Sequence, residues 1–295
     1  MRFADGMIVR NFQASGMMVA LVSAFGVFSA KAELPTLDDR KWVGNFLALE
    51  NKHYHFSVST RGRGKVEVVG KQGKTIGEMS AVTVDFVIQE TLPDGKTVTK
   101  TVQAESLESP QPAALKLANV VIRGKVTGDA AFEAYLNEER GTLSLGGKLL
   151  NPGTLKNPLR FGIRVNFPAR YTNSNDKPGE NDSKADAKKA AKALEEKSEK
   201  DRLQLKMMDG KSRKQSLTDA VDASTAEVNG PGIAALSLET SSYQEKKIML
   251  LASENSSMTL SNTSAKPLNT GFSVIWTADS AKDPEAKARL SIDVK

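Results

Sequence analysis

The chain has 295 residues, of which 39% are hydrophobic and 26% charged, with a formal net charge of +6 and no cysteine. The lack of cysteine excludes disulfides, thiolate metal centres and a lipid anchor on an N-terminal cysteine. So small a charge excess does not by itself predict nucleic acid or an anionic membrane as the partner.

Residues 1–32 predict a cleavable export signal. Two arginines precede the apolar run Met17–Ala30, and small residues occupy the positions before a cut after Ala32. The run is shorter than the roughly 20 residues that span a bilayer, so we expect no transmembrane span in the mature chain. The alternative interpretation is a prepilin processing site at Gly16, after which the apolar segment stays on the protein.

Residues 33–172 predict an N-terminal antiparallel β-region. Apolar and polar side chains alternate with a period of two, which indicates about eight half-buried strands. Pro93 and Gly95 predict a hairpin turn between two of these strands, and residues 137–141 predict another. The apolar positions of the clearest strands are Tyr54, Phe56 and Val58, then Val82, Val84, Phe86 and Ile88, and then Phe161, Ile163, Val165 and Phe167.

Residues 173–215 predict a charged linker with a helical insertion. From Lys184 to Met208 the chain is rich in Ala, Lys and Glu, which favour helix. The apolar stripe, which includes Leu205 and Met208, is thin, so we expect a solvated helix that connects two β-regions. A helix that docks on a partner and a disordered segment are the alternatives.

Residues 216–295 return to the strand pattern and predict about five further strands. These strands form either a second β-domain or the remainder of one sandwich begun by residues 33–172. The predicted fold class is therefore mainly β: an antiparallel β-sandwich, immunoglobulin-like or jelly-roll-like, with one charged helical insertion. The apolar positions are Leu236 and Leu238, Ile248–Ala252, Met258 and Leu260, Phe272, Val274 and Trp276, and Leu290, Ile292 and Val294.

His53 and His55 are the only histidines, and their spacing places both on one face of a strand. Two such imidazoles can bind one metal ion, but a zinc site takes three or four protein ligands. We therefore predict surface histidines and no metal site, and retain the pair as candidate ligands only.

Arg61, Arg63 and Lys65 lie in and beside a glycine-rich turn between two predicted strands. Guanidinium groups and turn amides bind sulfate, phosphate or carboxylate, so these residues are candidates for anion binding. A hairpin loop with soluble side chains accounts for them equally well.

No catalytic residue or cofactor is predicted. The chain lacks the Gly-x-Ser-x-Gly nucleophile elbow. A pair of glycosidase carboxylates is defined by its separation in space, so none can be chosen among the 35 acidic residues from sequence.

These patterns favour an exported, non-enzymatic β-sandwich protein, periplasmic, at the cell surface or secreted, that acts in binding, adhesion or assembly at the cell envelope. A component of a surface appendage such as a pilus is one form of this role. Expected partners are protein or glycan at the envelope; self-association is compatible with the role, and export argues against nucleic acid. The alternative is a secreted or periplasmic hydrolase that acts on glycans through loops at one end of the sandwich.

Overall fold

The structure, a computed structural model, describes residues 33–77, 81–168 and 183–295, apart from residues 224, 245, 263 and 264. The predicted export signal, the alternative processing site at Gly16 and the linker from residue 173 to residue 182 lie outside this part of the chain. The described residues all belong to one compact unit. No helix among the described residues is long and apolar enough to cross a membrane.

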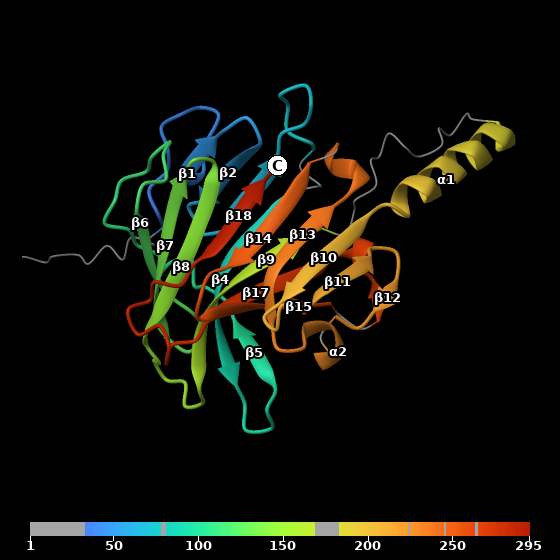
Figure 1. Cartoon of the computed structure of the whole chain (residues 1–295). Coiled ribbons are helices and arrows are strands. Elements are labelled where there is room, and N and C mark those ends of the chain that lie inside the picture. Colours follow the sequence, from blue (N-terminus) through green and yellow to red (C-terminus); the bar gives the residue numbers. More distant parts are fainter. Residues whose placement is uncertain (1–32, 78–80, 169–182, 224, 245, 263–264) are drawn as a thin grey trace, which may run out of the picture. The chain divides into compact units, whose positions relative to one another are not determined.

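Antiparallel strands dominate the described chain, which confirms the predicted mainly β fold class (Figure 1). The strands before the charged segment are β1 (Asn45–Glu50), β2 (Tyr54–Ser59), β3 (Gly64–Val68), β4 (Val82–Thr91), β5 (Thr97–Lys100), β6 (Val120–Lys125), β7 (Ala131–Glu139), β8 (Thr142–Asn151) and β9 (Leu159–Phe167). Those that follow it are β10 (Arg202–Met207), β11 (Ser212–Ser216), β12 (Ala220–Val221), β13 (Ile233–Glu239), β14 (Lys247–Ala252), β15 (Ser256–Ser261), β16 (Lys266–Pro267), β17 (Phe272–Ala278) and β18 (Leu290–Val294). The α-helices are α1 (Lys184–Ser198) and α2 (Ala226–Asn229), and Ser241–Tyr243 and Leu268–Thr270 form 3₁₀ turns.

The predicted hairpins are confirmed. β4 and β5 pair antiparallel, and the turn between them closes with the N–H of Gly95 bonded to the carbonyl of Leu92 at 2.9 Å. β7 and β8 pair along their whole length around a turn in which Arg140 and Gly141 both have positive φ. Glycine supplies that backbone conformation without strain.

Strands from the two sides of the charged segment are neighbours in the sheet. The order is β1-β2-β3-β4-β9-β17-β15-β13-β14-β18-β8-β7-β6, with β5 beside β4 and β10 beside β13 and β11. β15 and β13 share a single pair, Ile233 opposite Met258. We therefore divide the sheet there into a β4 half (β1–β5, β9, β15 and β17) and a β8 half (β6–β8, β10, β11, β13, β14 and β18).

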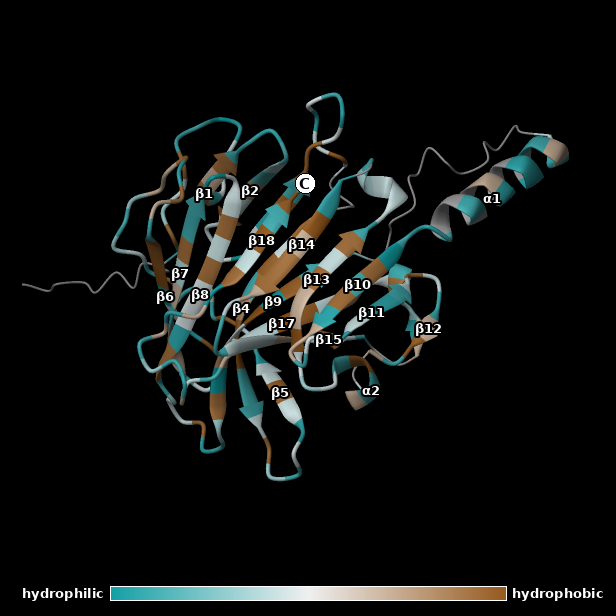
Figure 2. Ribbon diagram, in the orientation of Figure 1, coloured by the Kyte–Doolittle hydropathy of each residue, from teal (hydrophilic) through white to brown (hydrophobic). Residues whose placement is uncertain are grey.

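Apolar side chains from the two halves pack against each other. Phe132 of β7 lies 6.1 Å from Phe86 of β4 and 5.8 Å from Phe161 of β9, measured between ring centroids. Side chains alternate between the two faces of a strand, so hydropathy alternates along the ribbons (Figure 2). Each aromatic ring buried in this way contributes roughly 1.5–3 kcal/mol of hydrophobic free energy.

The predicted helix is confirmed from Lys184 to Ser198 and wrong beyond it. The hydroxyl of Ser183 accepts the N–H of Asp186 at 3.3 Å and so caps the first turn of α1. From Arg202 the chain is strand β10, which pairs with β11 and β13. The side chains of Leu203, Leu205 and Met207 are buried and spaced by two, and this period overrides the helix propensity of the neighbouring residues.

Candidate functional site

The turn that joins β2 to β3 carries two of the predicted cations, Arg61 and Arg63. The N–H of Gly62, between them, bonds to the carbonyl of Ser59 at 2.9 Å. Gly62 has a φ of 77°, and a Cβ there would come within 2.7 Å of the Leu107 side chain. This position therefore requires glycine, which fixes the two arginines on either side of a tight turn.

Next to this turn, β4 lacks a neighbouring strand over a short gap. β3 pairs with β4 only as far as Val84, and β5 pairs with it from Ile88 onward. The N–H of Thr91 bonds to Pro158 beside β9, so odd-numbered residues of β4 bond toward β9 and even-numbered residues toward the gap. Phe86 thus directs its N–H and C=O into the gap, where no backbone partner for either group is found among the described residues.

A cavity of about 370 Å³ opens at this gap. Its charged lining consists of Arg61, Arg63, Arg164 and Asp85, and we call these four residues the arginine pocket. The ring of Phe86 packs on Phe132 and Phe161, so its main chain is the part that faces the cavity. The remaining lining residues are Ser59, Gly62, Val87, Thr101, Val102 and Ala104.

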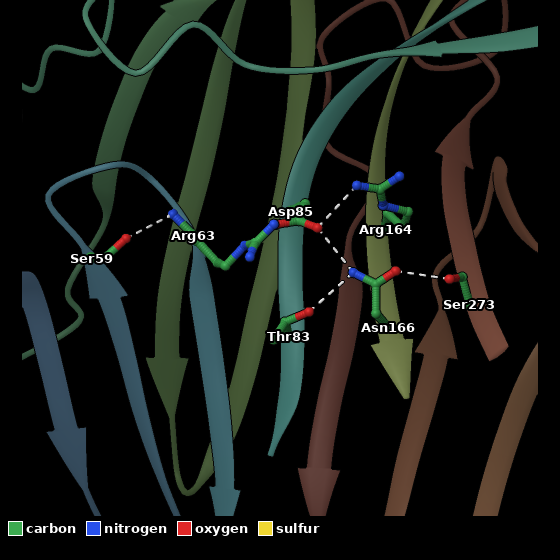
Figure 3. A network of polar contacts seen from close by, with 7 residues as sticks. All are labelled: Ser59, Arg63, Thr83, Asp85, Arg164, Asn166 and Ser273. Carbon is green, nitrogen blue, oxygen red and sulfur yellow. Dashed lines mark hydrogen bonds and ion pairs between the residues drawn. The ribbon is translucent and has the colours of Figure 1, made fainter. Parts of the chain in front are cut away.

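Asp85 holds the arginine pocket together (Figure 3). Its Oδ1 accepts a hydrogen bond from Nε of Arg63 at 3.0 Å, and its Oδ2 accepts from Nη2 of Arg164 at 3.1 Å. Asn166 donates to the same Oδ2 at 2.9 Å. Three donors thus converge on this carboxylate, which ties the β2–β3 turn to β4 and β9.

Positive charge is in excess at the arginine pocket. Arg61 is exposed, and no hydrogen bond or ion pair joins it to another described residue. Nε of Arg164 is buried and likewise has no acceptor in the part of the chain that the structure describes. Guanidinium groups bind sulfate, phosphate and carboxylate through charge-assisted hydrogen bonds, so the pocket has the chemistry of an anion site.

Lys65, the third predicted cation, does not join the arginine pocket. It lies on β3 and forms an ion pair with Glu67 at 3.0 Å. It lines a separate hollow of about 680 Å³ together with Lys74 and His55. The structure thus brings Arg61 and Arg63 together and places Lys65 on the same sheet in the neighbouring hollow.

The prediction placed His53 on the strand, but His53 lies just before β2, which begins at Tyr54. Nδ1 of its ring is 3.1 Å from Nζ of Lys246. Burial, followed by the positive charges of Lys246 and Lys52, lowers the pKa of His53. The environment therefore favours the neutral imidazole.

His55 has different neighbours. Its ring meets Trp42 edge to face at 6.2 Å, and its Nε2 lies 4.0 Å from a carboxylate oxygen of Glu50. No group of three or more His, Cys, Asp or Glu side chains suited to a metal ion occurs among the described residues.

Sequence reasoning missed Arg164, Asp85 and the open main chain of Phe86. Alternation does place Asp85 and Arg164 on the polar faces of two strands, which was the available signal. Their contact, between residues 79 positions apart, depends on the register of β4 with β9. The sequence of either strand alone does not determine this register.

No family model and no curated protein matches the chain. Among solved structures, it is similar to the alpha-N-acetylgalactosaminidase NagBb from Bifidobacterium bifidum in complex with GalNAc, with a TM-score of 0.47 and 12% identity over 84% of this chain and 35% of that one. The Gal-NHAc-DNJ complex of the same enzyme gives a TM-score of 0.49 at 12% identity, over 84% of this chain and 36% of that one. A bacterial glucoamylase complexed with acarbose gives 0.44 at 6% identity, over 89% of this chain and 33% of that one. The chain thus spans about a third of the length of these enzymes.

Proposed function

We propose that this chain is an exported, non-enzymatic β-sandwich protein that acts in binding, adhesion or assembly at the cell envelope. In this proposal the arginine pocket captures an anionic group of the partner. The observation that carries it is the exposed guanidinium of Arg61 beside a cavity that also presents the open N–H of Phe86. An anion placed there gains charge-assisted hydrogen bonds that the protein itself leaves unmade.

The number of carboxylates at the arginine pocket favours binding over hydrolysis. A glycosidase needs two carboxylates at a defined separation, one of them able to give or take a proton. Among the described residues that line this cavity, Asp85 is the one carboxylate, and Arg63 and Arg164 donate to its two oxygens. On the described residues, this cavity therefore offers one carboxylate where a glycosidase uses two.

Calorimetric titration of the mature chain with sulfate, phosphate and acetate tests anion capture. We expect saturable binding that weakens as salt is added, because salt screens exposed charges. Arg61→Gln should weaken it at least about tenfold, since a charge-assisted hydrogen bond contributes about 1.5–3 kcal/mol.

The matched control for Arg61→Gln is Arg140→Gln. Arg140 is also an exposed arginine in a hairpin turn, and its side chain is 91% exposed. Its replacement should leave binding unchanged. The proposal fails if none of the three anions binds, or if both substitutions weaken binding equally.

Cell fractionation tests the proposed location of the chain, and sedimentation tests whether it self-associates. The export proposal requires the chain in the periplasm or at the cell surface, with Glu33 as its first residue. A subunit of an appendage such as a pilus should self-associate, whereas a periplasmic binding module should sediment as a monomer. A cytoplasmic chain that retains residues 1–32 would reject the envelope role.

A further inference from the structure

The outer face of the β4 half, which points away from the core, carries a continuous row of polar side chains. Cross-strand pairing places one member on each of six successive strands, β2, β3, β4, β9, β17 and β15. Strands lie about 4.8 Å apart, so the row is about 24 Å long. The members of this polar row are Ser57, which is buried at one end, and the partly exposed Lys65, Thr83, Asn166, Ser273 and Ser261.

The polar row and the arginine pocket share this face. Asp85 follows Thr83 by two residues, and Arg164 precedes Asn166 by two, so the pocket lies in the adjacent row of the same face. Ser57 and Lys65 line the hollow of about 680 Å³ at one end of the row. Asn166, Ser273 and Ser261 line a hollow of about 730 Å³ at the other end.

Hydrogen bonds at the centre of the row determine which hydroxyl can donate to a ligand and which can accept from it (Figure 3). Nδ2 of Asn166 donates to Oγ1 of Thr83 at 3.1 Å, which leaves the hydroxyl hydrogen of Thr83 to be donated. Oγ of Ser273 donates to Oδ1 of Asn166 at 2.8 Å, which leaves its lone pairs to accept. The two positions on either side of Asn166 thus offer one donor and one acceptor, a combination that suits ligand hydroxyls, since a hydroxyl does both.

Charge along the face selects an acidic ligand. Lys74 and Lys266 line the two end hollows and extend the positive charge of the arginine pocket. Glu67 is the carboxylate of the first hollow, and Lys65 pairs with it. Potentials of one sign along a groove attract a partner of the opposite sign.

We propose that this face binds a linear acidic polysaccharide, with one sugar carboxylate in the arginine pocket and the sugar hydroxyls along the polar row. The inference rests on the proposed anion capture by Arg61 and its neighbours. A protein partner needs aromatic or aliphatic anchors, but the large hydrophobic side chains exposed on the described residues all lie outside these three hollows. Trp276 is fully buried, and Trp42 lines the first hollow but is only 8% exposed, which leaves little ring surface for stacking on nucleobases.

Titration of the mature chain with galacturonate and with its trimer and hexamer tests the inference. We expect affinity to rise at least about tenfold from monomer to hexamer, because each added sugar meets further hydrogen-bonding positions of the row. Ser273→Ala and Lys65→Gln should each reduce the ratio of hexamer to monomer affinity about fivefold, the value of one hydrogen bond. Thr97→Val removes an exposed hydroxyl of β5, outside the row, and should leave the ratio unchanged.

Other results would overturn parts of the proposal. Equal affinities for monomer and hexamer, with binding still lost in Arg61→Gln, would overturn the polysaccharide and retain the anion site. A dextran hexamer that binds as tightly as the acidic hexamer would overturn the selection by charge. Hexaglutamate that binds as tightly, with the same loss in Lys65→Gln, would assign the face to an acidic polypeptide. Sulfate binding without any binding of the galacturonate series rejects this inference alone, and no anion binding at all rejects the proposed function as well.

Discussion

Asp85 of β4 and Arg164 of β9 stand directly opposite each other in the ladder, and the guanidinium donates to the carboxylate at 3.1 Å. Their side chains are 14% and 27% exposed. The pair links β4 and β9, and both strands contribute residues to the cavity lining. Because Arg63 donates to the other carboxylate oxygen, one acidic residue positions two of the three arginines.

Asp85→Ala should lower the free energy of unfolding by about 1–3 kcal/mol, because it leaves the partly buried Arg164 without its acceptor. Asp85→Asn keeps one acceptor oxygen and should cost less. Both variants remove a negative charge from the pocket, so the folded Asn variant should bind sulfate more tightly than the natural chain. Urea unfolding and calorimetry measure the two effects.

The control for Asp85→Asn is Asp94→Asn, in the exposed β4–β5 turn. Asp94 pairs with Lys96 at the surface, where an ion pair contributes little to stability. A loss of sulfate affinity in Asp85→Asn would mean that the position of the arginines, and not the charge of Asp85, controls anion binding.

Gly147 of β8 lies where the two halves of the sheet pack closely. A Cβ there would come within 2.5 Å of both the carbonyl oxygen of Glu133 and the ring of Phe161. Gly147→Ala should therefore lower the free energy of unfolding by roughly 1–3 kcal/mol, as other overpacked cores do. Ser144→Ala on the same strand is the control, and an equal effect of the two substitutions would contradict close packing at Gly147.

Local pattern predicted the strands because each carries its own evidence of burial. Val82, Val84 and Phe86 alternate with polar residues, and all three are buried as expected. Around Leu203 and Leu205 the same signal was present but shorter, and the Ala-, Lys- and Glu-rich stretch before it masked the change of period. Pairing with β13 makes this segment a strand, and β13 lies some thirty residues away in the sequence.

The candidate site was predictable only in part, for the same reason. Arg61 and Arg63 come together because one short turn holds them. Asp85 and Arg164 join them through the register of β4 with β9, and the cavity exists because β3 and β5 leave Phe86 between them. Where a strand partner starts and stops depends on the pairing of the whole sheet.

Glu133 of β7 should make stability fall in acid. Hydrogen bonds from Tyr135 at 2.6 Å and Arg123 at 2.7 Å lower the pKa of this buried carboxyl below its usual 4.5. A lowered pKa gives stability that is present above the ordinary value and lost as the pH falls through the folded-state value. Glu133→Gln should thus cost about 2 kcal/mol at pH 7, and the cost should shrink as the pH falls below 4.5.

Urea unfolding between pH 7 and pH 3 measures this prediction for Glu133. Glu254→Gln, at an exposed turn, is the control and should follow the natural chain at every pH. A cost of Glu133→Gln that stayed constant down to pH 3 would show that the carboxylate charge is not what stabilises the fold.

Asp201, just before β10, should make stability depend on pH in the opposite direction to Glu133. Burial raises the pKa of its carboxyl, against the hydrogen bond that Oδ1 accepts from the N–H of Ser241 at 2.7 Å. A raised pKa means that the folded chain holds this proton more tightly, so its contribution is favourable at low pH and lost as the pH rises. Asp201→Asn keeps an acceptor for Ser241 without the buried charge, and should unfold at higher urea than the natural chain at pH 7. This gain in stability should shrink toward pH 4. Asp38→Asn, at an exposed position, is the control and should show no gain. Destabilisation by Asp201→Asn at pH 7 would mean that the hydrogen bond to Ser241 outweighs the cost of burying the charge.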